Sequence, residues 1–335
     1  VQYKVTGDLV SEPIYRRFSD FYSLREKLVE RWPGIYIPNL PPKLTVGNLE
    51  KKVIEMRTRV INDFCHKVSK FKFILNSDEF KLFLINCNDV SKVINNLPKL
   101  NYEEILSRYN LVFSDIIDKL DEDNEKYIKK VNEAIPFMKK VLLNLKAFKT
   151  SIISTEENKE KEINYYYDLM NVFENFEKNT LMEYVDNDQD KLVISNPKNN
   201  AADQKILDIK EQFRNPFTDL ASWINDDILD FKAMLDALES IINLNNLMDK
   251  LSSRLTAIED EIIKYQNNEY NFITLWLKWN TVPGILSELR QEEKNTKNTI
   301  KALNSIISIV SKITMDNLEI FKVEKLQRYH KHIKK

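Results

Sequence analysis

The chain has 335 residues, of which 43% are hydrophobic and 30% charged, and it contains only 4 Gly beside 10 Pro. This length predicts two domains, and the composition excludes both a disordered chain and a membrane-spanning one. The formal net charge of −1 provides no overall field that would draw the protein to nucleic acid.

Basic residues are concentrated at the start of the chain. Residues 1–90 hold 15 Lys and Arg against 11 Asp and Glu, whereas the remainder holds 35 against 40. Two thiols, Cys65 and Cys87, fit a reducing, cytosolic compartment better than a disulfide framework. Because Val1 starts no secretory leader and no apolar run reaches about 18 residues, any membrane contact is expected to be peripheral.

Residues 1–90 alternate between strand, helix and proline-rich patterns. Val1, Tyr3 and Val5 share one strand face, and a hairpin is expected through residues 1–18. Helical spacing follows from Ser19 to Trp32, and then prolines at 38, 41 and 42 predict an extended loop. Two further helical stretches, 49–68 and 77–87, complete a predicted α+β domain with helices around a small sheet.

The pattern beyond Pro98 predicts an all-α domain over residues 109–335. Apolar residues recur at steps of three and four over 128–152, 244–265 and 300–313, which predicts three long coiled-coil helices. Breaks are expected near 186–200 and 281–284, and Pro136 and Pro216 are expected to bend the helices. Because seams of this length exceed what a three-helix monomer buries easily, a dimer is expected.

A group of basic residues with one aromatic ring carries the chemistry of the N-terminal domain. Arg16, Arg17 and Phe18 end the predicted hairpin, Lys43 follows the prolines, and Arg57 and Arg59 lie on the next helix. Guanidinium groups bind phosphate oxygens as a bidentate fork, and an aromatic face suits a sugar ring. Alone, an Arg-Arg-aromatic run is more often a strand end with solvated charges, so the hypothesis depends on all three segments.

No catalytic or metal-binding motif accompanies this group. The sequence lacks G-x-S-x-G, a Gly-rich phosphate loop and H-E-x-x-H, and the three histidines, His66, His330 and His332, have no ligands at metal spacing. The protein is therefore not expected to be an enzyme, to hold a metal or to need a cofactor.

The same residues resemble a known family. The runs RRFSDFYSLREKL (16–28), LPPK (40–43) and IEMRTRVINDF (54–64) look like the phox-homology (PX) domain, and the resemblance covers about residues 1–88. It implies a three-stranded sheet whose first strand is missing here. It also implies that Arg17 binds the 3-phosphate of phosphatidylinositol 3-phosphate, Phe18 stacks under the inositol ring, Lys43 holds the 1-phosphate and Arg57 bonds the 4- and 5-hydroxyls, with Arg16 and Arg59 as supporting charges.

The second half resembles another domain. NPFTDLASWINDDILDFKAMLDALESI (215–241) is similar to the second helix of the BAR domains of sorting nexins. Together the two resemblances imply a PX-BAR sorting nexin, a cytoplasmic protein peripheral on endosomal membranes that binds a phosphoinositide, senses or induces tubulation and serves protein transport. They imply a homodimer or heterodimer, cargo or coat proteins as partners, and no nucleic acid. Residues 91–108 would then be a linker or an amphipathic membrane helix.

One alternative remains open at this point. The chain could be a structural or tethering coiled-coil protein whose PX-like module binds protein. Basic residues on the concave face of the dimer would favour membrane scaffolding, whereas an acidic concave face would favour a protein partner.

Overall fold

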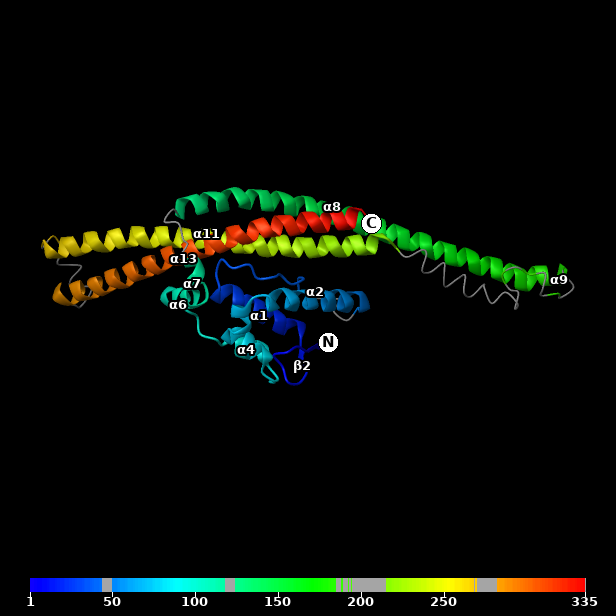
Figure 1. Cartoon of the computed structure of the whole chain (residues 1–335), viewed down its shortest axis with the longest axis horizontal. Helices are drawn as coiled ribbons and strands as arrows, with labels where there is room; N and C mark the ends of the chain where they lie inside the picture. Colours follow the sequence, from blue (N-terminus) through cyan, green and yellow to red (C-terminus); the bar gives the residue numbers. More distant parts are fainter. Residues whose placement is uncertain are drawn as a thin grey trace. The chain divides into compact units, whose positions relative to one another are not determined.

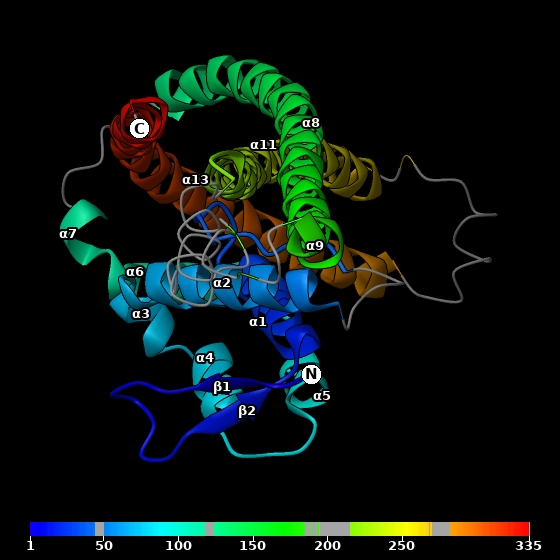
Figure 2. The same ribbon diagram turned by 90° about the vertical axis from the view of Figure 1, so that its right-hand side faces the viewer.

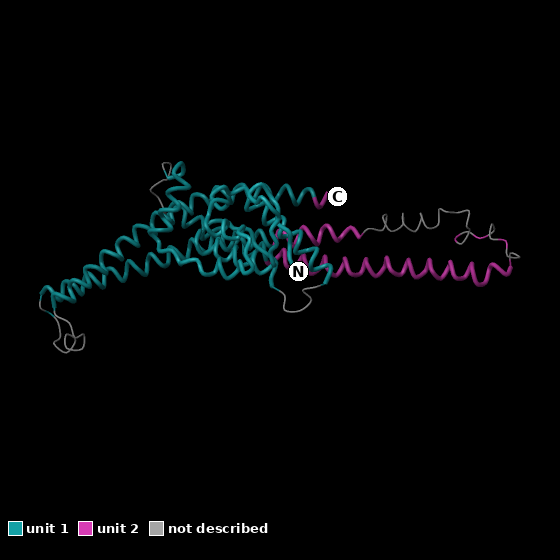
Figure 3. Tube along the Cα trace, turned by 90° about the horizontal axis from the view of Figure 1, so that it is seen from below, with its two compact units in different colours: residues 1–142, 229–331 teal, residues 143–228, 332–335 magenta. Residues whose placement is uncertain are grey.

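The computed structural model describes residues 1–43, 50–117, 124–184, 188, 192, 194, 215–267, 269 and 282–334. The chain divides into two compact units, of which unit 1 holds residues 1–142 and 229–331, and unit 2 holds residues 143–228 and 332–335 (Figure 3). Unit 1 contains the strands and short helices of the N-terminus together with parts of the long helices. Among the described residues, no helix is both long and apolar enough to cross a bilayer.

The sheet has two strands in the described part of the chain. Strand β1 (Tyr3–Val5) pairs antiparallel with β2 (Ile14–Arg16), with Tyr3 opposite Arg16. The predicted hairpin is confirmed, but a three-stranded sheet is not found. The reason is visible in the sequence, since only these two segments before the first helix have strand-like alternation, and the third strand came from the family resemblance alone.

The hairpin lies at one edge of the N-terminal helices (Figure 2), and these helices contribute most of the buried aromatic core. Phe21, Leu24 and Leu28 recur at helical spacing on α1 and are fully buried, together with Phe64 of α2 and Phe83 of α4. The helices are α1 (Phe18–Arg31), α2 (Lys51–Ser69), α3 (Lys72–Leu75) and α4 (Asp78–Leu84). The helical segments predicted at 19–32, 49–68 and 77–87 are therefore present.

The segment predicted as a linker or one amphipathic helix forms separate short helices. These are α5 (Val90–Asn95), α6 (Tyr102–Val112) and α7 (Ser114–Ile117). Ile94, Ile105 and Tyr109 are buried, and the Tyr109 hydroxyl donates to the Pro33 carbonyl at 2.7 Å. Of the six apolar side chains that suggested membrane insertion, Ile94 and Ile105 are therefore buried, whereas Val93 is 40% exposed.

In the described part of the chain beyond residue 123, three long helices predominate, as predicted (Figure 1). They are α8 (Asn124–Phe176), α11 (Phe217–Gln266) and α13 (Val282–Ile333), and a π-helix, η1 (Glu177–Leu181), leads into α9 (Met182–Tyr184). Pro136 lies inside α8, as expected, whereas Pro216 directly precedes α11 and does not lie inside it. The break expected at 186–200 lies mostly outside the described residues, and α13 begins within the break expected at 281–284.

Within unit 1, the N-terminal elements pack directly against α11 and α13. The Thr314 hydroxyl donates to the Gly34 carbonyl at 2.9 Å, and the Arg25 guanidinium pairs with Asp236 at 2.7 Å. Asp230 of α11 is 4% exposed and accepts from the Tyr36 hydroxyl at 3.2 Å. Hydrogen bonds and ion pairs thus join residues about two hundred positions apart.

Gly34 shows how closely the N-terminal elements approach α11 and α13 within unit 1. Its φ of 84° lies in the region that favours glycine, and a Cβ placed there would lie 2.9 Å from the Cβ of Val310 and 3.3 Å from Ile241 Cγ1. Replacing Gly34 with Ala is expected to lower the free energy of unfolding by roughly 1 to 3 kcal/mol, from backbone strain and overpacking.

Urea denaturation at fixed protein concentration measures this change. Gly7→Ala is the matched control, because a Cβ at Gly7 meets no atom within 4 Å. Equal denaturation midpoints for the two variants would show that Gly34 does not limit the packing between the N-terminal elements and α13.

Candidate functional site

Arg17 stands where β2 ends and α1 begins. Its backbone amide donates to Asp20 Oδ2 at 2.7 Å, and Asp20 Oδ1 accepts from the Ser91 hydroxyl at 2.7 Å. The carboxylate of Asp20 therefore fixes the backbone at the start of α1, close to the positive end of the helix dipole. The Arg17 side chain is exposed, so its guanidinium is accessible to a ligand.

Two aromatic rings follow on the next turns of α1. Phe18 and Tyr22 are four residues apart, share one helix face and meet edge to face with ring centroids 5.3 Å apart. The Arg57 guanidinium lies over the Phe18 ring at 4.2 Å, and the Lys43 ammonium lies over the Tyr22 ring at 4.6 Å. The structure thus brings three of the predicted residues into one row of cation, ring, ring and cation.

Arg57 reaches this row from α2 and is only 6% exposed. Burial raises the pKa of the Tyr3 hydroxyl, while the Arg57 guanidinium, which is hydrogen-bonded to it, acts in the opposite direction. Tyr3 on β1 and Phe18 on α1 therefore hold the guanidinium from two sides. A planar group fixed in this way is preorganised for bonding to a polar ligand.

Lys43 reaches the row from the proline-rich loop, which α1 holds in place. The Tyr22 hydroxyl donates a short hydrogen bond to the Pro41 carbonyl, and Arg25 Nε donates to the Pro38 carbonyl at 3.0 Å. The Tyr22 hydroxyl is protonated at neutral pH, and burial raises its pKa further, so it stays a donor into more alkaline solution. The loop is thereby attached to α1 at two carbonyl oxygens.

Arg16 and Arg59, which the sequence suggested as supporting charges, lie elsewhere. Arg16 is 2% exposed and donates from Nε to the Phe83 carbonyl at 2.8 Å and from Nη2 to the Ile85 carbonyl at 2.6 Å. Its guanidinium therefore ties β2 to the end of α4. Arg59 follows Arg57 by two residues in a helix, so the two side chains point to different faces of α2.

The pattern of charges suits an anion attached to a polyol. Arg57 and Lys43 place cations over Phe18 and Tyr22, and the exposed Arg17 directly precedes Phe18. The described residues contain no group of His, Cys, Asp or Glu that could hold a metal ion. Tyr3 and Tyr22 were not predicted as site residues. A signal for Tyr22 existed, because its spacing of four from Phe18 places both rings on one face.

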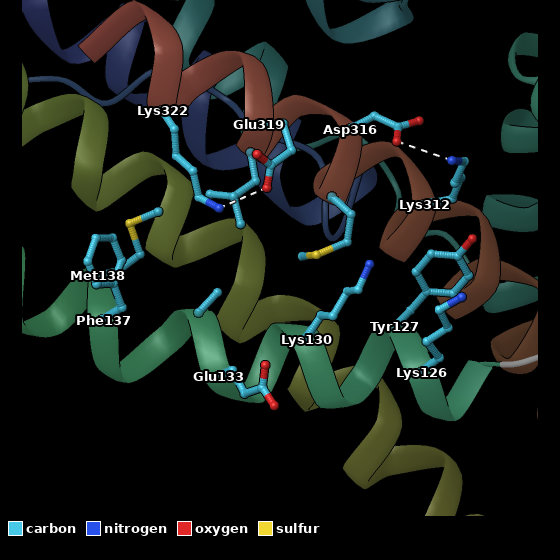
Figure 4. A pocket seen from close by; sticks show the side chains of 13 residues that line it. Lys126, Tyr127, Lys130, Glu133, Phe137, Met138, Lys312, Asp316, Glu319 and Lys322 are labelled. Atoms are coloured by element: carbon cyan, nitrogen blue, oxygen red, sulfur yellow. Dashed lines mark hydrogen bonds and ion pairs between the residues drawn. The ribbon is translucent and has the colours of Figure 1, made fainter. Parts of the chain in front are cut away.

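Apart from this site, a groove lies between α8 and α13 in unit 1 (Figure 4). This α8–α13 groove has a volume of about 660 Å³ and a floor that includes the buried side chains of Tyr127, Met138 and Leu318. Its lining carries mixed charge, with ion pairs Lys312–Asp316 at 3.2 Å and Lys322–Glu319 at 2.8 Å. The remaining charged residues of the lining are Lys126, Lys130 and Glu133.

Comparisons with known proteins match the N-terminal part of the chain. The family model of the PX domain matches residues 5–87. The human sorting nexin-8 is 32% identical over 84 residues, which cover 25% of this chain and 18% of that protein. Sorting nexin 1 of Arabidopsis thaliana is 34% identical over 73 residues (21% and 18%), and the vacuolar protein sorting-associated protein vps5 of Schizosaccharomyces pombe is 34% identical over 71 residues (21% and 12%). Each match thus spans less than a fifth of the relative's length.

A solved structure extends the similarity to the helices. The cryo-EM structure of the SNX-BAR Mvp1 tetramer superposes with a TM-score of 0.51 and 14% sequence identity, covering 99% of this chain and 91% of that chain. At this identity the match establishes the fold. The chain therefore has a PX domain at its N-terminus and, over its whole length, the fold of a PX-BAR sorting nexin.

Proposed function

We propose that the protein binds membranes containing phosphatidylinositol 3-phosphate and acts, without catalysing a reaction, in endosomal sorting and membrane remodelling. In this proposal Arg17 binds the 3-phosphate, Phe18 supports the inositol ring, Lys43 contacts the 1-phosphate and Arg57 bonds the 4- and 5-hydroxyls. The observation that carries the proposal is the convergence of Lys43, Phe18 and Arg57 from three separate segments beside the exposed Arg17.

The chemistry of the site favours a phosphorylated sugar over other anions. Arginine binds phosphate oxygens through two parallel N–H groups, whereas an aromatic face beside it contacts the apolar side of a ring. Arg16 has a structural role here, because its guanidinium already donates to backbone carbonyls. The printed name of the vps5 relative, a vacuolar protein sorting-associated protein, supports a role in protein sorting.

Vesicle flotation tests this function. The protein is mixed with phosphatidylcholine vesicles that contain no phosphoinositide, phosphatidylinositol 3-phosphate, or an isomer phosphorylated at another position. Binding confined to the 3-phosphate vesicles is expected. Equal binding to every phosphoinositide would contradict the specificity, and binding to none would contradict the membrane function.

Self-association is the second part of the proposal, and an exposed stripe on α8 supports it. Tyr165, Leu169, Val172 and Phe176 of unit 2 follow one another at steps of four, three and four, and each is 48% exposed or more. This spacing is that of a coiled-coil seam, and an apolar stripe of this kind marks a protein-binding surface. A second copy of the chain carries the same stripe, so the two stripes can pair in a two-fold symmetric dimer.

The α8–α13 groove of unit 1 independently favours a protein contact. Phe137 is 53% exposed on its edge, and the lining combines an apolar floor with both signs of charge. A bilayer surface would favour uniformly basic side chains, whereas mixed charge around apolar groups is typical of subunit interfaces. The solved structure of Mvp1 is that of a tetramer, which agrees with self-association of a chain with this fold.

Charged substitutions in the α8 stripe are expected to weaken the dimer. The double variant Leu169→Asp, Val172→Asp places two carboxylates in the apolar seam, and self-association is expected to fall about 100-fold or more. Both side chains are exposed in the single chain, so folding should be retained.

Sedimentation equilibrium measures the molar mass against concentration. Asn171→Asp is the matched control, because Asn171 is exposed and lies two residues from Leu169, on another face of α8. An unchanged dissociation constant in the double variant would exclude this stripe as the interface.

A further inference from the structure

Tyr22 lies at the centre of the candidate site, although a head group held as proposed above touches other residues. Its ring packs edge to face against Phe18 at 5.3 Å, and the Lys43 ammonium lies 4.6 Å from its centroid. Its hydroxyl donates to the Pro41 carbonyl. One side chain therefore contacts the loop, the loop's lysine and the aromatic residue beneath the ligand.

The loop between Pro38 and Lys43 needs such a contact. Its prolines lack backbone N–H groups, so the segment cannot pair as a strand or close a helical turn on itself. Proline also stiffens the backbone, which means that an anchor at the Pro41 carbonyl constrains the position of Lys43 two residues later. Arg25 fixes the other end of the segment at the Pro38 carbonyl.

Lys43 gains most from being held. A lysine side chain has about four rotatable bonds, so it loses much conformational entropy when a ligand immobilises it. A ring that attracts the ammonium group in the free protein reduces this loss on binding, and preorganisation of this kind increases affinity without any new contact to the ligand.

We propose that Tyr22 is a positioning residue that holds Lys43 at the head-group site, through its hydroxyl to the Pro41 carbonyl and through its ring to the ammonium group. This inference rests on the proposed phosphoinositide function and adds to it a residue that does not touch the lipid. Tyr22 is half-buried beside Phe18, which leaves Lys43 exposed towards a ligand.

Two substitutions separate the contributions. Tyr22→Phe removes the hydrogen bond but keeps the ring, and affinity for 3-phosphate vesicles is expected to fall about 2- to 10-fold. Tyr22→Leu removes both contacts, and a loss of roughly 5- to 50-fold is expected. Tyr15→Leu is the matched control. It should leave the affinity for 3-phosphate vesicles unchanged, because Tyr15 is 56% exposed on β2.

A double-mutant cycle with Lys43 distinguishes positioning from general support of the fold. If Tyr22 acts through Lys43, the effect of Tyr22→Leu should fall below about 2-fold in a Lys43→Ala protein. If the fold-loss of affinity in the double variant equals the product of the losses in the two single variants, Tyr22 acts independently of Lys43. That result would overturn the proposal.

Hydrogen exchange without lipid gives a readout that does not depend on the proposed function. The amides of Leu40 and Lys43 should exchange faster in Tyr22→Phe than in the wild type, while those of α2 remain unchanged. Unchanged exchange at both amides would also overturn the proposal. If the wild-type protein binds no vesicle, the lipid function fails, and the exchange result alone decides whether Tyr22 holds the loop.

Discussion

Replacing Asp230 with Asn is expected to cost about 3 to 5 kcal/mol of unfolding free energy, as is usual when one partner of a buried ion pair is removed. The Asp230 side chain is 6% exposed, and its carboxylate pairs with Lys67 at 2.5 Å, with Lys325 and with Arg328 at 3.3 Å. The amide of Asn would leave these cations close together without the charge that compensates them.

The location of Asp230 explains why its loss should affect the whole of unit 1. Lys67 belongs to α2 of the PX domain, whereas Lys325 and Arg328 belong to α13. Tyr36, from the loop after α1, donates to the same carboxylate. One side chain of α11 thus joins three segments, and its removal should loosen the PX domain from the long helices.

Asp236→Asn is the matched control for this prediction. Asp236 lies on the same helix and also pairs with a PX residue, Arg25, but its side chain is 46% exposed. Exposed ion pairs contribute only about 0 to 1 kcal/mol, so this variant should unfold close to the wild type. If urea denaturation shows the same loss of unfolding free energy in Asp230→Asn and Asp236→Asn, the Asp230 contacts do not have the importance assigned to them.

The pH dependence of stability should show the same ion pairs. Burial alone raises the pKa of Asp230, but Lys325 and Lys67 outweigh it and hold that pKa below its ordinary value of 3.8. A lowered pKa contributes stability that is present above the unfolded value and is lost as pH falls through the folded one. The wild type should therefore lose this contribution only below about pH 4, and Asp230→Asn should lack that part of the acid dependence.

The strand pattern distinguishes Arg16 from Arg17, although the two residues are of the same type. Ile14 and Arg16 share one face of β2, and both are buried, while Tyr15 and Arg17 are exposed. The period of two therefore predicts which arginine can meet a ligand. By contrast, the carbonyls that accept from Arg16 belong to Phe83 and Ile85, and nothing local in the sequence identifies them.

The long helices and the separate basic segments were predictable, but their contacts were not. Apolar periodicity identifies α8, α11 and α13 because a helix repeats every 3.6 residues. The pair Lys67–Asp230 joins residues 163 positions apart, and such a pair depends on the packing of complete elements. Likewise, residues 91–108 were predicted to be a linker or an amphipathic membrane helix. Their apolar spacing does not distinguish a bilayer from the PX core as the surface that they cover.

Replacing Arg17 with Gln is expected to lower affinity for 3-phosphate vesicles about 100-fold, because a charged, bidentate contact to phosphate is lost and two copies of the site act together on one membrane. Stability should not change. The Arg17 side chain is exposed, and the bond to Asp20 that starts α1 comes from its backbone amide.

Arg59→Gln separates specific recognition from general charge. The substitution removes the same charge from the same domain, but Arg59 lies on a different face of α2 from Arg57. If attraction to anionic lipid alone drives binding, both variants should weaken it by a similar factor and both effects should fade as salt is raised. If Arg17 reads the 3-phosphate, only Arg17→Gln should abolish the preference for 3-phosphate vesicles over those with an isomeric phosphoinositide. Loss of preference in Arg59→Gln, with Arg17→Gln unchanged, would place the phosphate-reading residue on α2 instead of at the start of α1.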